Sequence, residues 1–228
     1  VKMKGKWGII NKAGQFEVPP QFDEIYALSN GSFSAQKDKK QSLFIPKSQT
    51  LIEFKPDTIF RIDHSPTASQ YLLRYREANK LGFIHTNGQI RVQAQFANAQ
   101  GFKEDLAAVK KDQKWGFIDT LGVFKIEPEY DTVFSFREGL AGVKKDGKWG
   151  YIDQSNHIVL AMQFDQVHNF RDGLGWVQKN GLWGLVNDQG QMLIQPQFAA
   201  FRIFRDSVAF VQGKNLWGLV DASGRILF

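Results

Sequence analysis

The sequence predicts an all-β fold built from tandem repeats, and three observations support this class. Glycines recur at positions 82, 116, 150, 184 and 218, each 34 residues after the last, and a fixed period of this length indicates a repeat architecture. The chain contains 20 Phe and 6 Trp against 3 Met, a composition that suits sheets better than helices. Short apolar segments alternate with glycine-containing turns, as expected of short strands.

Each copy is centred on a Trp-Gly pair. The clearest copy is Lys148-Trp149-Gly150-Tyr151-Ile152-Asp153, and between the first and third copies the segment Ser42-Leu43-Phe44-Ile45 is interpreted as a degenerate version. The sequence therefore predicts a single array over residues 1–228, with units centred on Gly8, Leu43, Gly82, Gly116, Gly150, Gly184 and Gly218. The sequence begins with Val1 instead of Met, which is consistent with a segment cut from a longer array.

Turn residues divide each copy into strands. Asp146-Gly147 predicts a two-residue type I′ hairpin, because both central residues of that turn need positive φ. A second glycine column predicts the turn into a third strand; it consists of Gly14, Gly88, Gly122, Gly190 and Gly224. Pro20, Pro128 and Pro196 lack an amide donor, so we expect each of them to end that third strand. Each repeat is then a small antiparallel meander.

A meander of this size cannot bury its own faces, so neighbouring repeats must stack. We predict that the recurring tryptophan rings form the core between repeats, beside a glycine that lets another backbone approach closely. These rings are Trp7, Trp115, Trp149, Trp183 and Trp217. The array is an open, twisted, solenoid-like stack or a β-propeller; the open form is favoured because a four-stranded blade commonly takes about 40 residues or more.

Several classes of active site are not supported by the sequence. The absence of cysteine excludes disulfides, thiolate metal sites and a Cys nucleophile. The four histidines, His64, His85, His157 and His168, lie in different repeat columns and do not suggest a metal site. A column that includes Asp119, Asp153 and Asp221 suits side chains that cap turns better than a catalytic pair. We therefore expect no enzyme activity, no cofactor and no metal.

Lysines recur at the predicted hairpin tips of this basic chain, whose net charge is +6. In Lys144-Lys145-Asp146-Gly147-Lys148, as in other copies, stacking would align the lysines as a ridge along one edge, with acidic residues on other edges. Regularly spaced lysines can bind phosphates, but Arg is scarce on the ridge and charged tips usually serve solubility. We therefore do not expect nucleic acid as a partner. No apolar run approaches the roughly 18 residues of a membrane helix, so no membrane insertion is expected.

The repeated pattern resembles the WG (KWG) repeat family of bacterial proteins. The resemblance is carried by Lys-Trp-Gly-aromatic-Ile-Asp, a glycine turn, a Pro-x-aromatic-Asp corner and Phe-x-x-Gly-Leu-Ala-x-Val. It covers nearly the whole chain and is weak from about Gly31 to Asn79. It implies an all-β scaffold without catalytic residues. Because members are often found in secreted or envelope-associated proteins, it also favours a periplasmic or extracellular location over a cytoplasmic one.

Candidate contact residues lie where the sequence departs from the repeat. The segment from Lys55 to Lys80 contains residues that the repeat does not require, and Tyr and Arg dominate binding hot spots. These candidates are Arg61, Asp63, His64, Tyr71, Arg74, Tyr75 and Arg76. The alternative is a degenerate repeat with a longer loop. Trp176, on a strand that carries smaller residues elsewhere, is a core filler or a ring that faces a ligand.

These observations predict a non-catalytic protein-interaction scaffold of a bacterial envelope or secretion-related system, such as an inhibitor or immunity protein. Repeat arrays offer long surfaces, so another protein is the expected partner. The alternative is a module that binds polysaccharide or peptidoglycan through exposed aromatic rings.

Overall fold

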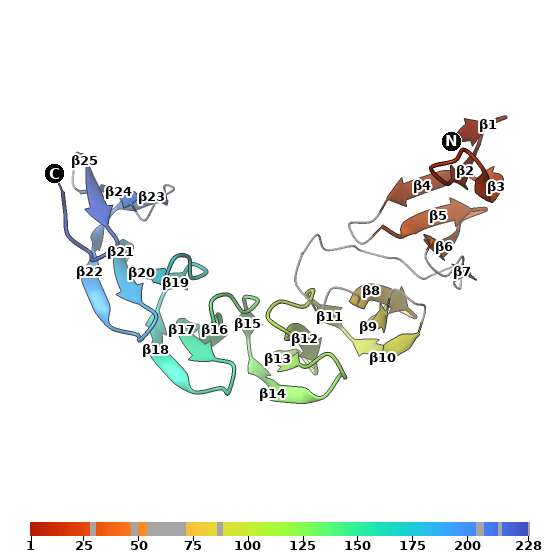
Figure 1. Cartoon of the computed structure of the whole chain (residues 1–228). Coiled ribbons are helices and arrows are strands. Elements are labelled where there is room, and N and C mark those ends of the chain that lie inside the picture. The colour runs from red at the N-terminus through yellow and green to blue at the C-terminus, as the bar shows by residue number, and fades with distance from the viewer. Residues whose placement is uncertain are drawn as a thin grey trace. The chain divides into compact units, whose positions relative to one another are not determined.

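The computed structural model describes residues 1–27, 31–46, 50–53, 72–85, 89–203, 208–213 and 216–227. Every named element within these ranges is a β-strand, which confirms the all-β prediction. Figure 1 shows the strands gathered into successive small sheets, and the chain divides into two compact units. Unit 1 comprises Val1–Asp112 and Ile118–Val123, and unit 2 comprises Gln113–Phe117 and Phe124–Phe228.

Unit 1 contains three sheets whose strands follow the chain order. They are β1 (Lys2–Met3), β2 (Lys6–Ile10) and β3 (Phe16–Phe22); β4 (Glu24–Ala27), β5 (Phe33–Lys37), β6 (Lys40–Ile45) and β7 (Thr50–Glu53); and β8 (Leu72–Glu77), β9 (Lys80–His85) and β10 (Ile90–Phe96). The unit also includes β11 (Asn98–Ala99) and β12 (Ala107–Lys111). The pairings within each sheet are antiparallel.

Unit 2 begins with most of β13 (Lys114–Ile118) and with β14 (Phe124–Tyr130). Three further sheets follow, again in chain order: β15 (Thr132–Val133), β16 (Leu140–Lys145), β17 (Lys148–Asp153) and β18 (Ile158–Phe164); β19 (Gln166–Val167), β20 (Leu174–Lys179), β21 (Leu182–Asn187) and β22 (Met192–Phe198); and β23 (Ala200–Ile203), β24 (Val208–Gln212) and β25 (Trp217–Asp221). Tandem antiparallel meanders are therefore confirmed.

The predicted turns form as local chemistry requires. Asp146 and Gly147 have φ of 52° and 79°, and Lys145 pairs with Lys148, which is the type I′ geometry. At the next turn, Asp153 Oδ1 accepts the backbone N–H groups of residues 155 and 157, both at 2.8 Å. Four other side chains of this column cap their turns in the same way: Asn11, Asp119, Asn187 and Asp221. The predicted capping role of the column is confirmed.

The Trp-Gly glycine lies where the outer strand of the repeat crosses the strand that contains it. Trp149 pairs with Phe164 and Tyr151 with Leu160, so two extra residues of β18 bulge above Gly150. A Cβ built on Gly150 would lie 2.3 Å from the Leu160 carbonyl oxygen. At Gly8, Gly82, Gly116 and Gly184 the corresponding distance to an outer-strand carbonyl is 2.4–2.7 Å. Glycine is needed here because no side chain fits beneath the bulge.

The crossing has the same geometry in several repeats of this chain. It corrects the prediction for the prolines. Pro20, Pro128 and Pro196 lie inside β3, β14 and β22, not at the ends of these strands. The ring nitrogens of all three lie 2.7–2.8 Å from the Cβ position of the paired glycine, so they belong to the bulge. A proline is tolerated where the ladder is already interrupted, and the strand continues beyond it.

The second repeat shows what happens when the bulge is absent. Lys37 pairs with Lys40 at the hairpin, which places Ser42, 34 residues after Gly8, at the glycine position; the predicted centre, Leu43, is one residue further on. Strand β7 then pairs with β6 from Ser42 to Ile45 without a register shift. Because no bulge crosses this position, a residue with a Cβ is accepted.

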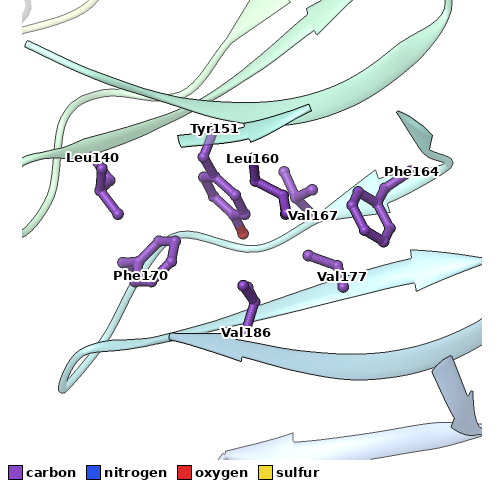
Figure 2. Packing of buried hydrophobic residues seen from close by; sticks show 8 residues of the cluster. All are labelled: Leu140, Tyr151, Leu160, Phe164, Val167, Phe170, Val177 and Val186. Carbon is purple, nitrogen blue, oxygen red and sulfur yellow. The ribbon is translucent and has the colours of Figure 1, made fainter. Parts of the chain in front are cut away.

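Neighbouring sheets of unit 2 pack face to face. Tyr151, Leu160 and Phe164 of one sheet contact Val177 and Val186 of the next, within one buried cluster (Figure 2). The same positions recur between the last two sheets, where Leu185, Ile194 and Phe198 pack with Ala209, Val211 and Val220. Burial of these apolar faces is the main force that holds repeats together.

The tryptophans are less uniformly buried than the sequence predicted. Trp183 is 8% exposed, Trp115 and Trp149 are half-buried, and Trp7 and Trp217 are 37% and 41% exposed. The position two residues on is the deeply buried one, and it holds Phe83, Phe117, Tyr151 or Leu185, each at most 1% exposed. The ring follows the hairpin tip directly, near the end of the sheet, where Trp149 stacks on Phe134 with centroids 4.8 Å apart. For Trp7 and Trp217 the predicted core position is therefore wrong.

Replacing Gly150 with Ala tests the crossing. The new methyl would have to displace the backbone of β18, so we expect a loss of about 1–3 kcal/mol in the free energy of unfolding, measured by urea denaturation. Gly213→Ala is the matched control, because the nearest atom to its Cβ position is 3.9 Å away, and it should change stability by less than about 0.5 kcal/mol. Equal losses in the two variants would contradict the crossing constraint.

Candidate interaction surface

Of the seven predicted contact residues between Lys55 and Lys80, four lie outside the described residues: Arg61, Asp63, His64 and Tyr71. Arg74 and Arg76 are half-buried on β8. Arg74 Nη1 donates a hydrogen bond of 2.5 Å to the carbonyl oxygen of Ala99. This bond ties Arg74 to the adjacent repeat of unit 1, so part of its guanidinium has a structural role.

Two predicted contact residues are core residues. Tyr75 is 2% exposed, and its hydroxyl accepts a 3.0 Å hydrogen bond from the Ala94 amide; burial raises its pKa. Trp176 is 4% exposed and stacks on Phe201 with centroids 4.2 Å apart and planes 9° apart. The contact prediction is therefore corrected for Tyr75, and Trp176 is the core filler of the two alternatives.

A surface that the sequence reasoning missed begins at the first residue of each outer strand. We call these positions the outer row: Phe16, Ile90, Phe124, Ile158, Met192 and, in the last repeat, Ile226. Phe16 and Ile90 are each 47% exposed, Ile158 is 62% exposed and Ile226 is 52% exposed; Phe124 and Met192 are half-buried. The signal was present in the sequence, because each row residue is apolar and lies two residues after the turn column.

At four row positions the preceding residue is oriented by the turn. Asn187 Nδ2 donates to Gln191 Oε1 at 3.0 Å, and Asn11 Nδ2 donates to Gln15 Oε1 at 3.2 Å. In two other turns the residue contacts the capping aspartate: His157 Nδ1 lies 2.9 Å from Asp153 Oδ2, and Arg225 Nε lies 3.4 Å from Asp221 Oδ2. Phe16, Ile158, Met192 and Ile226 therefore each follow a polar side chain that is anchored through one atom, whereas Phe124 follows Val123, which is 55% exposed.

The row is continuous across the sheets of unit 2, because each turn packs on the outer strand of the preceding repeat. A Cβ on Gly190 would meet the Val159 carbonyl oxygen at 2.1 Å, and one on Gly224 would meet Leu193 Cβ at 3.0 Å. The outer strands β18 and β22 thus lie along the same edge of neighbouring sheets (Figure 1). Ile158, Met192 and Ile226 are consecutive members of one strip.

At the hairpin tips, lysines and carboxylates meet instead of separating. Lys148 Nζ lies 2.6 Å from Asp165, Lys114 Nζ lies 2.5 Å from Asp131, and Lys6 forms the same pair with Asp23. In each case the lysine hydrogen bond is the largest cause that lowers the pKa of the aspartate. The expectation that the two signs segregate to different edges is wrong, because the aspartate that directly follows the outer strand lies beside the tip. The pairing also weakens the case for a phosphate-binding ridge.

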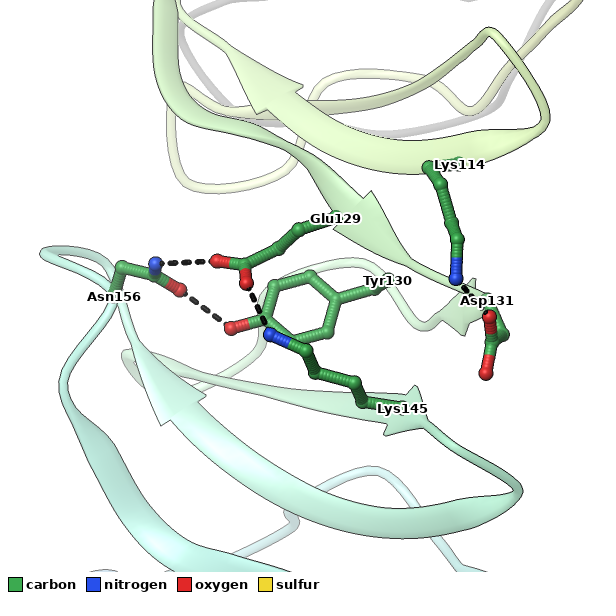
Figure 3. A network of polar contacts seen from close by, with 6 residues as sticks. All are labelled: Lys114, Glu129, Tyr130, Asp131, Lys145 and Asn156. Carbon is green, nitrogen blue, oxygen red and sulfur yellow. Dashed lines mark hydrogen bonds and ion pairs between the residues drawn. The ribbon is translucent and has the colours of Figure 1, made fainter.

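One polar network links β14 to the next sheet (Figure 3). Glu129 accepts hydrogen bonds from Lys145 at 2.5 Å and from Asn156 at 3.0 Å, and the Tyr130 hydroxyl donates to Asn156 Oδ1 at 2.7 Å. The bond from Lys145 is the largest cause that lowers the pKa of Glu129, and burial raises the pKa of Tyr130 to about 12. Other repeats use a neutral version, in which Lys179 donates to Gln163 at 3.0 Å. The network therefore links neighbouring repeats. Its hydrogen bonds and burial account for the shifted pKa values of Glu129 and Tyr130, so these shifts do not indicate a reactive centre.

Over the described ranges, no three His, Asp or Glu side chains are grouped closely enough to hold a metal ion. In the same ranges no helix is long and apolar enough to cross a membrane. What the arrangement offers is a repeated apolar strip with anchored polar neighbours, which suits contact with another molecule.

Substituting Glu129 with Gln gives a pH-dependent prediction. The folded state holds the pKa of Glu129 below its usual value, so its contribution is present above about pH 4.3 and is lost as pH falls through the lowered pKa. Because the pair is partly exposed, we expect a loss of about 0.5–1 kcal/mol near neutral pH that disappears in acid. Urea unfolding across this pH range measures it. Exposed Glu127→Gln is the control, and an identical pH profile for both variants would contradict the prediction.

Comparison with known proteins supports the repeat assignment. The family model of the WG containing repeat matches residues 7–40, 82–115, 115–149, 149–183 and 183–217. No curated protein sequence matches the chain. A crystal structure of the eukaryotic initiation factor is 13% identical, with 97% of this chain and 70% of that chain covered and a TM-score of 0.51.

Two further solved structures are similar at lower scores. KlHsv2 with loop 6CD replaced by a Gly-Ser linker is 12% identical, covering 89% of this chain and 78% of that chain, with a TM-score of 0.48. The extracellular domain of the putative one component system BT4673 from B. thetaiotaomicron is 10% identical, covering 94% of this chain and 35% of that chain, with a TM-score of 0.39. At these identities a likeness concerns the fold alone. The match to the family model, in contrast, covers most of the sequence, and the chain therefore belongs to the family of proteins that contain the WG repeat.

Proposed function

We propose that this chain is a non-catalytic protein-interaction scaffold of a bacterial envelope or secretion-related system, in which it acts as an inhibitor or immunity protein. The observation that supports the interaction role is the outer row. Envelope context and inhibitory action are suggested by the resemblance to the WG repeat family and belong to the proposal.

The outer row supports this function because its exposure has no explanation in the packing of the fold. Ile158 leaves 62% of its surface open and Ile226 leaves 52% open, and the position is apolar in six of the seven repeats, with Thr50 at the start of β7 as the exception. Single exposed apolar residues are common on any protein, but a contiguous strip with polar neighbours marks an interaction site. Polar residues anchored at 157, 191 and 225 flank the strip and can hydrogen bond with a partner.

A glycan-binding module is the second candidate, and the exposed tryptophans favour it. Lys2 lies over the Trp7 ring at 5.6 Å, and the Arg202 guanidinium lies over the Trp217 ring at 5.2 Å. Rings that are partly exposed and polar at one edge suit stacking against sugars. The outer row spans more repeats than these two rings, so the protein partner is preferred.

The proposed function predicts that the double variant Ile158→Ser and Ile226→Ser loses its partner without unfolding. The immobilised chain is incubated with an extract and with cell-wall glycan from the source organism, and captured material is quantified. We expect a discrete protein on the parent chain and about tenfold less on the variant, because truncating the few hot-spot residues of an interface costs more than about 1 kcal/mol each.

Tyr26→Ser is the matched control, since Tyr26 is 59% exposed on β4, outside the outer row. It should retain full capture, and thermal melting should show that all variants stay folded. Unchanged capture by the double variant would rule out the outer row as the site. Retention on glycan that is lost in Trp217→Ala, with no protein captured, would establish the second candidate instead.

A further inference from the structure

The sixth and seventh repeats depart from the charge pattern of the hairpin tips. Lys145 pairs with Lys148 in the fifth repeat, and Lys179 pairs with Leu182 in the sixth, so Leu182 occupies the position of Lys148. Ala199 directly follows β22, as Asp165 directly follows β18. Both members of the ion pair are therefore replaced in the sixth repeat, and Leu216 stands before Trp217 where Lys148 stands before Trp149.

Stability does not explain this double replacement. Leu182 is 40% exposed and Leu216 is 80% exposed, so neither side chain gains much burial. An exposed ion pair contributes only about 0–1 kcal/mol, and its loss is tolerable, but an uncovered leucine offers no compensation within the fold. The apolar side chains are therefore available to a second molecule.

One cation lies beside each of these two tips. Lys179, directly across the hairpin from Leu182, donates to the neutral side chain of Gln163 at 3.0 Å. The carboxylate of Asp165 is held by Lys148 at 2.6 Å and by the Asn180 amide at 2.7 Å, and the charge of Lys179 acts on it without a direct ion pair. In the last sheet, the guanidinium of exposed Arg202 lies over Trp217, which is 41% exposed. We call this set the apolar tip: Leu182, Leu216 and Trp217 with Lys179 and Arg202.

We propose that the apolar tip binds an acidic segment of a partner protein that also carries apolar side chains. Charge complementarity sets the sign of the segment, because Lys179 and Arg202 flank the leucines and the local carboxylate position is occupied by Ala199. Arg202 is already oriented by its contact with Trp217, which lowers the entropy cost of pairing with a carboxylate. Leu182 and Leu216 supply the apolar contacts.

A single segment fits this surface better than a lipid bilayer does. Stacked sheets lie about 10 Å apart, so the two leucines form a narrow line along the tips of two adjacent sheets. Binding to a membrane surface needs a broad apolar face that enters the headgroup region, whereas a narrow line with a cation on either side suits one extended chain. The hairpin tips and the outer row lie at opposite ends of the meander strands. This surface is therefore distinct from the outer row.

Restoring the ion pair of the other repeats tests the proposal. Labelled peptides of alternating Asp and Leu are titrated with the parent chain and followed by fluorescence anisotropy, alongside peptides with Lys in place of Asp or Ser in place of Leu. We expect binding of the Asp-Leu peptide that weakens with salt, and at least about tenfold weaker binding of the other two.

The variant Leu182→Lys with Ala199→Asp should lose about tenfold in affinity. It should stay folded, because the same pair is present in three other repeats.

The reciprocal variant, Lys148→Leu with Asp165→Ala, extends the leucine line by one repeat and should strengthen binding. The outer-row variant Ile158→Ser with Ile226→Ser should bind the peptide like the parent chain, so this result is independent of the proposed function above. No binding of the Asp-Leu peptide, or equal affinity of the parent and the Leu182→Lys, Ala199→Asp variant, would overturn the proposal. Equal binding of the Lys-Leu peptide, or preferential binding to anionic phosphatidylglycerol vesicles with loss of the peptide, would also overturn it.

Discussion

The close crossing of the outer strand over the central glycine is the contact on which each repeat depends. At Gly150 the Leu160 carbonyl occupies the space that a side chain would need. The bulge that produces this crossing shifts the register, which places Phe164 opposite Trp149. It then delivers Asp165 to the hairpin tip, where it meets Lys148. A single backbone approach therefore determines which positions of the repeat meet, although they are distant in the sequence.

The second repeat supports this view from within the same chain. Its β7 pairs with β6 without a shift, and Ser42 stands where the other repeats need glycine. The two side chains that follow this position are buried, with Leu43 at 0% and Phe44 at 1% exposed. Face-to-face packing can therefore be kept while the crossing is lost, and the glycine is required by the bulge and not by the stack.

Features that depend on neighbours a few residues apart could be predicted from the sequence, and features that depend on the register could not. The Asp146-Gly147 turn and the Asp153 cap involve atoms within four residues, so composition alone indicates them. The pairing of Lys148 with Asp165 joins residues 17 apart and exists only because the bulge displaces the outer strand. For the same reason Pro128 was expected at the end of a strand that in fact continues to Tyr130.

The same distinction explains why Tyr75 was predicted to be a contact residue. Tyr75 looked irregular in the sequence, yet its ring fills space above Gly82 and its hydroxyl meets Ala94, so it serves the core. The outer row was overlooked because it is regular, and regularity suggests structure. In a stacked array, however, a regular column lies either inside the stack or along its edge. Ile158, 62% exposed at the start of an edge strand, belongs to the second kind, where repetition lengthens a surface.

The columns that are free to vary are those that the crossing does not constrain, and this determines where a repeat protein can acquire specificity. Exchanging Gly184 would disrupt the bulge, since the Ile194 carbonyl is 2.5 Å from its Cβ position. Exchanging the ion pair at the tip for Leu182 and Ala199 leaves the hairpin register of the sixth repeat identical to that of the fifth. The fold therefore tolerates new chemistry at the tips at little cost, so the tips are positions where one repeat can differ from the next without loss of the crossing.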